Sequence, residues 1–218
     1  MLTSYVTITS RSEFSRNKTG FGYMVYDIAR SVGKLVDVEV MASDVRYDEF
    51  EKDRIKFVGV SYWKILRNTF RCLNVGFLAS LILKYHIPYK TAIRLIYYWW
   101  LSGYVSSLIT ERRYDIVHIH GCGFYTEMWM RVCRRAGQRF VVTLHGLNSF
   151  SDTVRLDASS KQYERDFLRR VVEGELPITV ISTGMRRLIE KTFNVAKCPN
   201  ITVVCNSFSF SSDKVARR

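Results

Sequence analysis

Two stretches of the sequence decide the fold: residues 114–121 read YDIVHIHG, and residues 139–148 read RFVVTLHGLN. Each is a short apolar run that ends in His-Gly, without strict alternation of apolar and polar residues. Continuous apolar runs of this length are typical of parallel strands that are covered on both faces. The two stretches therefore predict buried strands over 116–120 and 140–144.

The same pattern recurs along the chain. Further strand signals lie at 5–9, 36–41, 55–60, 178–181 and 201–204, and helical patterns lie at 21–32, 63–84, 89–112, 125–136, 160–173 and 184–193. Alternation of strands and helices is typical of a doubly wound sheet. We therefore expect an α/β fold with a mainly parallel, seven-stranded, Rossmann-like sheet and helices on both faces.

Composition limits the class of protein. The chain has 218 residues, 47% hydrophobic residues, and 33 Lys+Arg against 20 Asp+Glu, which gives a net charge of +13. This mix predicts a packed core, and the absence of a linker before the last dozen residues predicts one domain. The N-terminus has no signal-peptide pattern, and five scattered cysteines indicate neither a disulfide framework nor a cysteine zinc site, so we expect a cytoplasmic protein.

In such a sheet, ligands bind outside the carboxyl ends of the strands. Gly20 and Gly22 follow the first strand as Gly-Phe-Gly, which is either a tight turn or an anion cradle at a helix N-terminus. Val25 stands where the dinucleotide fingerprint needs a third glycine or alanine, so NAD binding is not favoured. Ser182 follows the sixth strand as a helix N-cap candidate, and the free N–H groups there could also meet a hydroxyl or a phosphate.

Three of the four histidines lie at two strand ends that we expect to be adjacent. His118 and His120 belong to the fourth strand, and His145 follows the fifth. A single histidine in such a run is usually a core residue, but two successive strands that end in His-Gly favour a shared cleft. Zinc binding by the three imidazoles is disfavoured, because no carboxylate or cysteine spacing completes a ligand set. Nucleophilic catalysis is also disfavoured, because there is no G-x-S-x-G elbow.

The order of these motifs resembles the N-terminal half of the retaining glycosyltransferases of family four, which have the GT-B fold. The resemblance rests on YDIVHIHG (114–121), RFVVTLHGLN (139–148), ITVISTGMRRLIEKTF (178–193) and NITVVCNS (200–207), and it spans most of the chain. In that family the N-terminal domain mainly binds the acceptor, and a second Rossmann-like domain binds the nucleotide sugar. The active site lies between the two domains.

The resemblance implies roles for individual residues. His145 matches a histidine close to the reacting sugar, Gly20 and Gly22 match a loop that approaches the donor phosphates and the acceptor, and His120 with Gly121 matches a turn on the acceptor side. The candidate site therefore has His145 as its catalytic residue, with Gly20, Gly22, His120, Gly121, Gly146, Asn148 and Ser182 as acceptor- or phosphate-binding residues and no metal ligand. No cofactor is implied beyond the nucleotide-sugar co-substrate.

The sequence departs from the family pattern in three places. Ser182-Thr183-Gly184 stands for the usual Ser-Glu-Ala, Asn206-Ser207 stands for Asn-Gly, and the paired glutamates of an E-x7-E segment are absent. We therefore expect residues 1–206 to form the N-terminal domain and 207–218 to begin a linker or tail, with the nucleotide-sugar domain absent and the isolated chain inactive.

The function implied is the acceptor-binding half of a retaining transferase that acts on a glycan or lipid-linked acceptor, in a setting such as polysaccharide biosynthesis. The alternative is a non-catalytic glycan- or membrane-binding module. Binding to nucleic acid is disfavoured, because no recognition helix, RNP or zinc-finger signature accompanies the positive charge.

A basic, aromatic segment predicts peripheral contact with an anionic membrane at the inner face of the cytoplasmic membrane. The segment 61–115 has a local charge of +6, from eight basic residues and two acidic ones, together with Trp63, Tyr97, Tyr98, Trp99 and Trp100. Family members that extend lipid-linked glycans dock through such surface on this domain. The competing interpretation is that these aromatic residues form core between two helices. Neither apolar stretch, 73–83 or 95–109, has the length of a membrane span.

Overall fold

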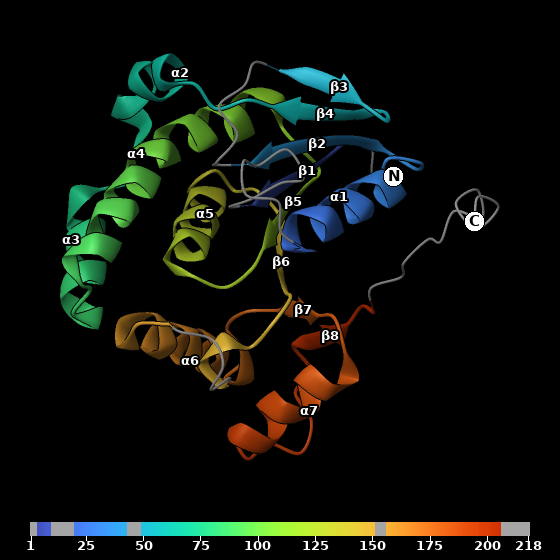
Figure 1. Ribbon diagram of the computed structural model, residues 1–218, viewed down its shortest axis with the longest axis vertical. Coiled ribbons are helices and arrows are strands. Elements are labelled where there is room, and N and C mark those ends of the chain that lie inside the picture. The colour runs from blue at the N-terminus through green and yellow to red at the C-terminus, as the bar shows by residue number, and fades with distance from the viewer. Residues whose placement is uncertain (1–3, 10–19, 43–48, 151–155, 206–218) are drawn as a thin grey trace, which may run out of the picture.

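A computed structural model describes residues 4–9, 20–42, 49–150 and 156–205. One eight-stranded sheet lies at its centre, with the order β3-β4-β2-β1-β5-β6-β7-β8 (Figure 1). The strands are β1 (Ser4–Thr9), β2 (Asp37–Ala42), β3 (Phe50–Lys52), β4 (Ile55–Val58), β5 (Ile116–His120), β6 (Phe140–Leu144), β7 (Ile178–Val180) and β8 (Ile201–Val203). All neighbours pair in parallel except β3 with β4. The predicted Rossmann-like α/β class is confirmed.

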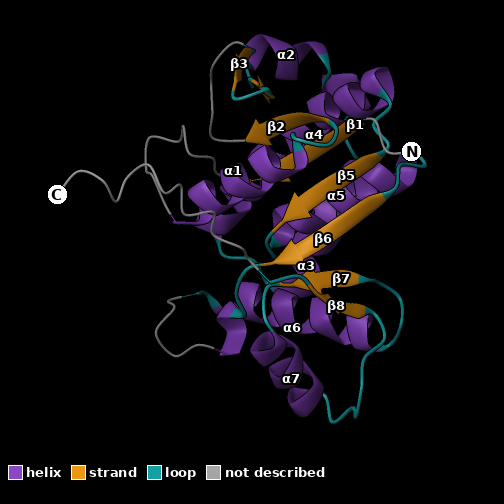
Figure 2. Cartoon of the chain, turned by 90° about the vertical axis from the view of Figure 1, so that its right-hand side faces the viewer, coloured by secondary structure: helices purple, strands orange, loops and turns teal. Residues whose placement is uncertain are grey.

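The helices are distributed unequally over the two faces of the sheet. They are α1 (Gly20–Val32), α2 (Tyr62–Arg67), α3 (Val75–Tyr85), α4 (Tyr89–Arg112), α5 (Phe124–Arg135), α6 (Ala158–Val172) and α7 (Thr183–Thr192), with 3-10 turns η1 (Thr69–Arg71) and η2 (Asn148–Phe150). Helices α2 to α7 contribute to the large core on one face. Helix α1 packs over β1, β2 and β4 on the other, and β5 and β6 have no described helix in front of them there (Figure 2).

The structure adds a strand that the sequence pattern did not indicate. Strand β3 has only three residues, two of them charged and exposed, so it lacks the apolar run of a buried strand. It pairs antiparallel with β4 across a turn in which Asp53 and Arg54 have positive φ, and the ring of Phe50 stacks on Phe57 at 4.7 Å. Pairing with a neighbour, rather than its own composition, makes this segment a strand.

The prediction of one continuous helix over 63–84 is wrong, because side chains of α4 bond the backbone in the middle of this segment. The backbone N–H of Leu73 donates to the hydroxyl of Ser102 at 3.1 Å, and the carbonyl of Leu73 accepts from Nε1 of Trp99 at 2.6 Å. These bonds replace the helical partners of Leu73, and Asn74 caps the N-terminus of α3 with its side chain. The segment is therefore divided into α2, η1 and α3.

The aromatic cluster on α4 packs mainly against the large core. Tyr97, Tyr98, Trp99 and Trp100 are half-buried and pack against the large core, as the competing interpretation expected, whereas Trp63 on α2 is 79% exposed. Among the described residues, no helix combines the length and the apolarity needed to cross a membrane.

The close packing of α4 against the segment around η1 requires a glycine at position 103. A Cβ at position 103 would collide with the carbonyl oxygen of Asn68 and lie 3.0 Å from Sγ of Cys72. We expect Gly103→Ala to lower the free energy of unfolding by about 1–3 kcal/mol, the usual cost of overpacking. Urea unfolding followed by circular dichroism measures this change.

Gly184→Ala is the matched control, since this second helical glycine has no atom nearer than 3.7 Å to its would-be Cβ. We expect the control to keep or slightly raise stability. Equal effects of the two changes would contradict the close approach of α4 to the segment before η1.

Candidate functional site

Three segments converge at the carboxyl ends of the central strands. The imidazoles of His120, at the end of β5, and His145, after β6, are joined by a hydrogen bond between Nδ1 of His120 and Nε2 of His145 at 2.7 Å. Their rings stack with centroids 5.0 Å apart, and the ring of Phe21, in the first turn of α1, meets His145 edge-on at 5.2 Å. The predicted pair of histidines thus shares one site with the start of α1.

The turn after β5 requires glycine at position 121. Gly121 has φ of +92°, and a Cβ there would collide with the hydroxyl of Tyr125. That hydroxyl donates to the carbonyl of His120 at 3.3 Å, and the hydroxyl of Thr126 donates to the carbonyl of Gly121 at 3.1 Å. Side chains of α5 therefore fix the backbone that follows His120.

A buried carboxylate holds the loop after β6. Glu164 of α6 is 2% exposed and accepts hydrogen bonds from the backbone N–H groups of Asn148, at 3.1 Å, and of Ser149. Glu164 is not among the site residues predicted from the sequence. The available signal was an acid between Tyr163 and Phe167 on the apolar face of α6, where an unpaired carboxylate would be costly.

The remaining predicted residues take different positions. Gly20 begins α1 and Gly22 is buried in its first turn, while residues 10–19 of the expected loop lie outside the described residues. Ser182 caps α7, because its hydroxyl accepts from the N–H of Met185 at 3.1 Å. Gly146 and Asn148 follow His145 in the loop that Glu164 holds. The tail at 207–218 and the Asn206-Ser207 step also lie outside the described part.

The imidazoles of the site are neutral at pH 7. Burial lowers the pKa of His145 from 6.5 to about 4. Burial, with a smaller contribution from the charge on His145, lowers the pKa of His118 to about 3. The pKa of His120 also falls well below 6.5, chiefly because this side chain is fully buried. Each ring therefore offers one N–H donor and one lone pair.

The arrangement of possible metal ligands can be examined for the part of the chain that the structure describes. Within those residues, no group of three or more His, Cys, Asp or Glu side chains is arranged to hold a metal ion. Both ring nitrogens of His120 already have hydrogen-bond partners, Thr7 and His145. The histidines are therefore organised as a hydrogen-bonded group.

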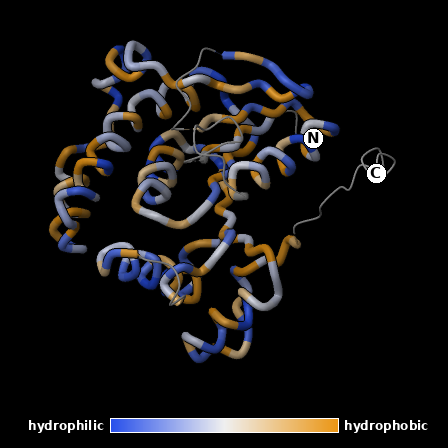
Figure 3. Tube along the Cα trace, viewed as in Figure 1, coloured by the Kyte–Doolittle hydropathy of each residue, from blue (hydrophilic) through white to orange (hydrophobic). Residues whose placement is uncertain are grey.

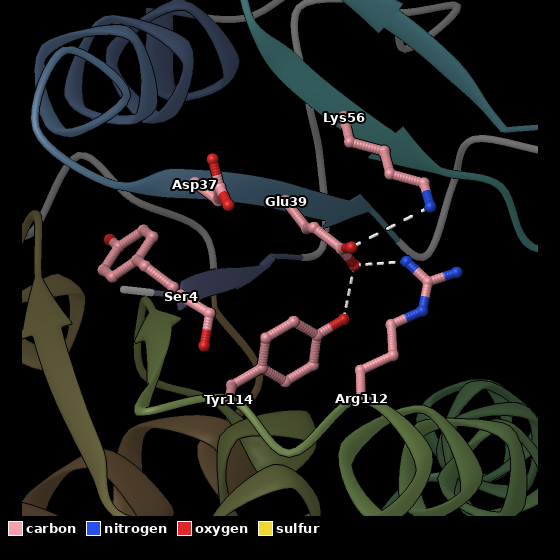
Figure 4. Close-up of a pocket in the computed structure, with 7 residues that line it drawn as sticks. Ser4, Asp37, Glu39, Lys56, Arg112 and Tyr114 are labelled. Carbon is pink, nitrogen blue, oxygen red and sulfur yellow. Dashed lines mark hydrogen bonds and ion pairs between the residues drawn. The ribbon is translucent and has the colours of Figure 1, made fainter. Parts of the chain in front are cut away.

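A cavity of about 400 Å³ lies at the opposite, amino end of the strands (Figure 4). At its centre the carboxylate of Glu39 accepts from Arg112 and from the hydroxyl of Tyr114 and lies 4.0 Å from Nζ of Lys56. These charges pair with one another, which suits a structural role. No motif in the sequence indicates this cluster.

Comparison with known proteins places the chain in a family. The sequence model of glycosyltransferase family 4 matches residues 19–209, and no curated protein sequence matches. Sucrose-phosphate synthase from Thermosynechococcus elongatus is similar in structure, with a TM-score of 0.55 and 9% identity over 93% of this chain and 48% of that one. An α,α-trehalose-phosphate synthase from Burkholderia xenovorans gives a TM-score of 0.49 with 12% identity over 85% and 42%, and a putative UDP-N-acetylglucosamine 2-epimerase from Listeria monocytogenes gives 0.48 with 10% identity over 93% and 45%.

The domain has the Rossmann-like fold of the GT-B glycosyltransferases. Because the family match covers most of the sequence, the chain belongs to glycosyltransferase family 4. It spans about half the length of the structures it resembles, 48% in the case of the sucrose-phosphate synthase.

The low pKa values of the histidines predict a dependence of stability on pH. Below pH 6.5 the unfolded chain binds protons at these imidazoles and the folded chain does not, so the free energy of unfolding falls as the pH falls towards about 4. Each such proton changes it by about 1.4 kcal/mol per pH unit. Urea unfolding between pH 6.5 and 5, above the range where most carboxylates titrate, measures this slope.

His145→Gln is the informative variant, because it removes one imidazole and keeps a polar side chain. We expect its slope to be lower by the contribution of one proton. A free energy of unfolding that stays level over this range in the wild-type chain would show that the imidazoles are not buried in the neutral form.

Proposed function

We propose that this chain is the acceptor-binding, N-terminal half of a retaining glycosyltransferase that transfers a sugar from a nucleotide sugar to a glycan or lipid-linked acceptor. The observation that carries the proposal is the site in which His145, His120 and the start of α1 meet, within a chain that belongs to glycosyltransferase family 4. In a parallel α/β sheet this edge is where ligands bind.

The donor nucleotide is bound in this proposal by a second domain. Residues 1–206 then form the acceptor domain, and 207–218 lead towards the donor domain. The chain's span of about half of a GT-B structure, 48% for the sucrose-phosphate synthase, supports this division. In this proposal the chain supplies only the acceptor side of the active site, so by itself it is expected to be inactive.

In the complete site, His145 contributes a neutral imidazole next to the reacting sugar. Its low pKa excludes a fixed positive charge at pH 7, so its contribution is a directed hydrogen bond. Glu164 and Gly121 keep the flanking loops in place, and the first turn of α1 lies beside the ring through Phe21.

Replacement of His145 tests this role. In an enzyme reconstituted from this chain and a donor domain, we expect His145→Ala to lower turnover roughly 100-fold while the circular dichroism spectrum stays unchanged. The measurement is the release of nucleotide from a panel of nucleotide sugars in the presence of a sugar acceptor.

His86→Asn is the matched control, because His86 is an exposed histidine that ends α3 in the left-handed region, which asparagine tolerates. Full turnover by the His145 variant would remove this residue from the site. If the wild-type chain binds glycans but supports no transfer with any donor domain, the alternative of a non-catalytic binding module would replace the proposal.

A second part of the proposal is that the chain docks on an anionic membrane surface through α2, η1, α3 and α4, which lie along one edge of the molecule. Figure 3 shows apolar segments along this edge. The exposed apolar side chains recur at helical spacing on each segment, at Tyr62, Trp63, Leu66 and Phe70, at Val75 and Leu83, and at Tyr89, Ile93 and Ile96. We call this set the apolar edge.

The positive charge around the apolar edge favours an anionic lipid surface as its partner. No acidic residue occurs between Asp53 and Glu111 in the sequence. Lys64, Arg71 and Lys84 pair with acids from other segments, whereas Arg67, Lys90 and Arg94 form no ion pair with a described residue. Each exposed basic side chain adds about 1 kcal/mol at an anionic lipid surface, and burial of the apolar edge adds to it.

Vesicle co-sedimentation tests the docking. We expect binding to vesicles that contain anionic lipid, weaker binding as salt rises, and a marked loss of binding in the double variant Trp63→Ser, Phe70→Ser. Arg67→Gln with Arg94→Gln should reduce the salt-sensitive part alone.

Leu35→Ser is the control, because Leu35 is 84% exposed but lies between α1 and β2, away from the apolar edge. Equal binding to neutral and anionic vesicles at low salt would contradict docking by charge. Binding that survives high salt would point to insertion of the aromatic side chains.

A further inference from the structure

A chain of polar side chains crosses the sheet on the face that carries α1. Strands β1, β5, β6 and β7, which lie side by side (Figure 2), supply six of its members, and the seventh, His145, directly follows β6. They are His145, His120, Thr7, Tyr5, His118, Thr143 and Thr179, and we call them the polar seam. Six hydrogen bonds connect these seven side chains in one unbranched row.

The half of the polar seam near β7 ends on the backbone. Nε2 of His118 is 2.5 Å from Oγ1 of Thr143, which in turn bonds Oγ1 of Thr179. The hydroxyl of Thr179 lies 3.5 Å from the carbonyl oxygen of Val142. A carbonyl oxygen can only accept, so this end of the seam is a fixed acceptor.

The other half leads to the candidate site. The hydroxyl of Tyr5 bonds Nδ1 of His118 and lies 3.1 Å from the hydroxyl of Thr7. Oγ1 of Thr7 is 3.2 Å from Nε2 of His120, and Nδ1 of His120 is 2.7 Å from Nε2 of His145. Nδ1 of His145 is buried and has no hydrogen-bond partner among the described residues.

The protons of the polar seam must all point the same way. Each hydroxyl carries one proton, and each neutral imidazole carries one N–H and one lone pair. Burial raises the pKa of Tyr5, so its phenol keeps its proton, and the three imidazoles are neutral at pH 7. An imidazole therefore has to accept at one nitrogen and donate at the other, and a hydroxyl that accepted from both neighbours would need a third partner for its own proton. As long as no hydroxyl donates outside the row, a proton that points towards one end at any link fixes the direction of every other link.

The two ends select the direction. If the seam donates towards β7, the proton of Thr179 meets the carbonyl of Val142, and His145 is left with a bare lone pair on Nδ1. In the reverse direction, two oxygen lone pairs would face each other at Val142, and His145 would bury an N–H without an acceptor. In folded proteins, a buried N–H group without an acceptor is rarer than a buried acceptor without a donor. Both ends therefore favour donation towards β7.

We propose that the polar seam, anchored at the carbonyl of Val142, holds His145 in the tautomer with its proton on Nε2 and its lone pair on Nδ1. Thr179 and Thr143 are then positioning residues that act on His145 through the links between them. Nδ1 is buried in this structure, so contact with a ligand requires that the atom first becomes exposed; if the proposed transfer site is correct, on which this step alone rests, a group that then reaches Nδ1 has to donate a hydrogen bond. A sugar hydroxyl does so and a phosphate oxygen does not.

Nitrogen NMR of the full chain without substrate tests the tautomer directly. In long-range proton–nitrogen correlation spectra of the 15N-labelled chain at pH 7, we expect a pyrrole-type Nε2 and a pyridine-type Nδ1 for His145. The variant His145→Gln assigns the signal. A pyrrole-type Nδ1, or an imidazolium pattern, in the wild-type chain would overturn the proposal.

Removal of the Thr179 hydroxyl tests whether this end of the polar seam determines the tautomer of His145. Thr179→Val keeps the shape of the side chain but breaks the link to Val142, so we expect the signal of the second tautomer of His145 to appear. Thr179→Ser restores the hydroxyl and should restore the single form. Thr202→Val is the matched control, because Thr202 is the register partner of Thr179 on β8 and does not belong to the seam.

An unchanged tautomer in a folded Thr179→Val chain would overturn the proposed coupling. If that variant does not fold, the wild-type spectrum still decides the direction of the seam. Because neither readout uses sugar transfer, the polar seam can fail while the proposed function stands, and the reverse outcome is equally distinguishable.

Discussion

The parallel register of β5 against β6 is the constraint on which the site depends. It pairs His120 with Thr143, so that the next side chain on the same face of β6, His145, reaches His120 at 2.7 Å. A slip of one residue would turn every histidine of β5 to the apolar face, among the residues of the large core. Register, core and site are therefore specified together, because the same alternation that buries Val117 and Ile119 on one face places polar groups on the other.

The sequence predicts most of the fold for a simple physical reason. Seven strands place apolar side chains in a hydrophobic core and are therefore visible as short, mainly apolar segments, and the helices between them carry apolar stripes. Strand β3 and the division of the helix expected over 63–84 could not be predicted, since a neighbour determines both of them: β4 pairs with β3, and Trp99 with Ser102 captures the backbone of Leu73.

The candidate site also contains residues that the sequence indicates and residues that it does not. The pairing of His120 with His145 follows from two strand ends that the sequence marks with His-Gly. Glu164, Tyr125 and Phe21 come from helices and act on backbone or ring edges, so no short motif announces them. The sequence predicts only part of the surface expected to contact a membrane, because composition cannot distinguish the half-buried rings of α4 from the exposed Trp63.

Helix α6 joins two regions that are described separately above. Its Glu164 holds the loop after His145, its Asp166 pairs with Lys84 of α3 at 3.7 Å, and Asp157 at its start accepts from Thr91 of α4 at 3.4 Å. One rigid rod thus has one attachment at the site and two at the helices of the apolar edge. Contacts of a single helix thus connect α3 and α4 with the loop beside His145 by a route that does not pass through the sheet.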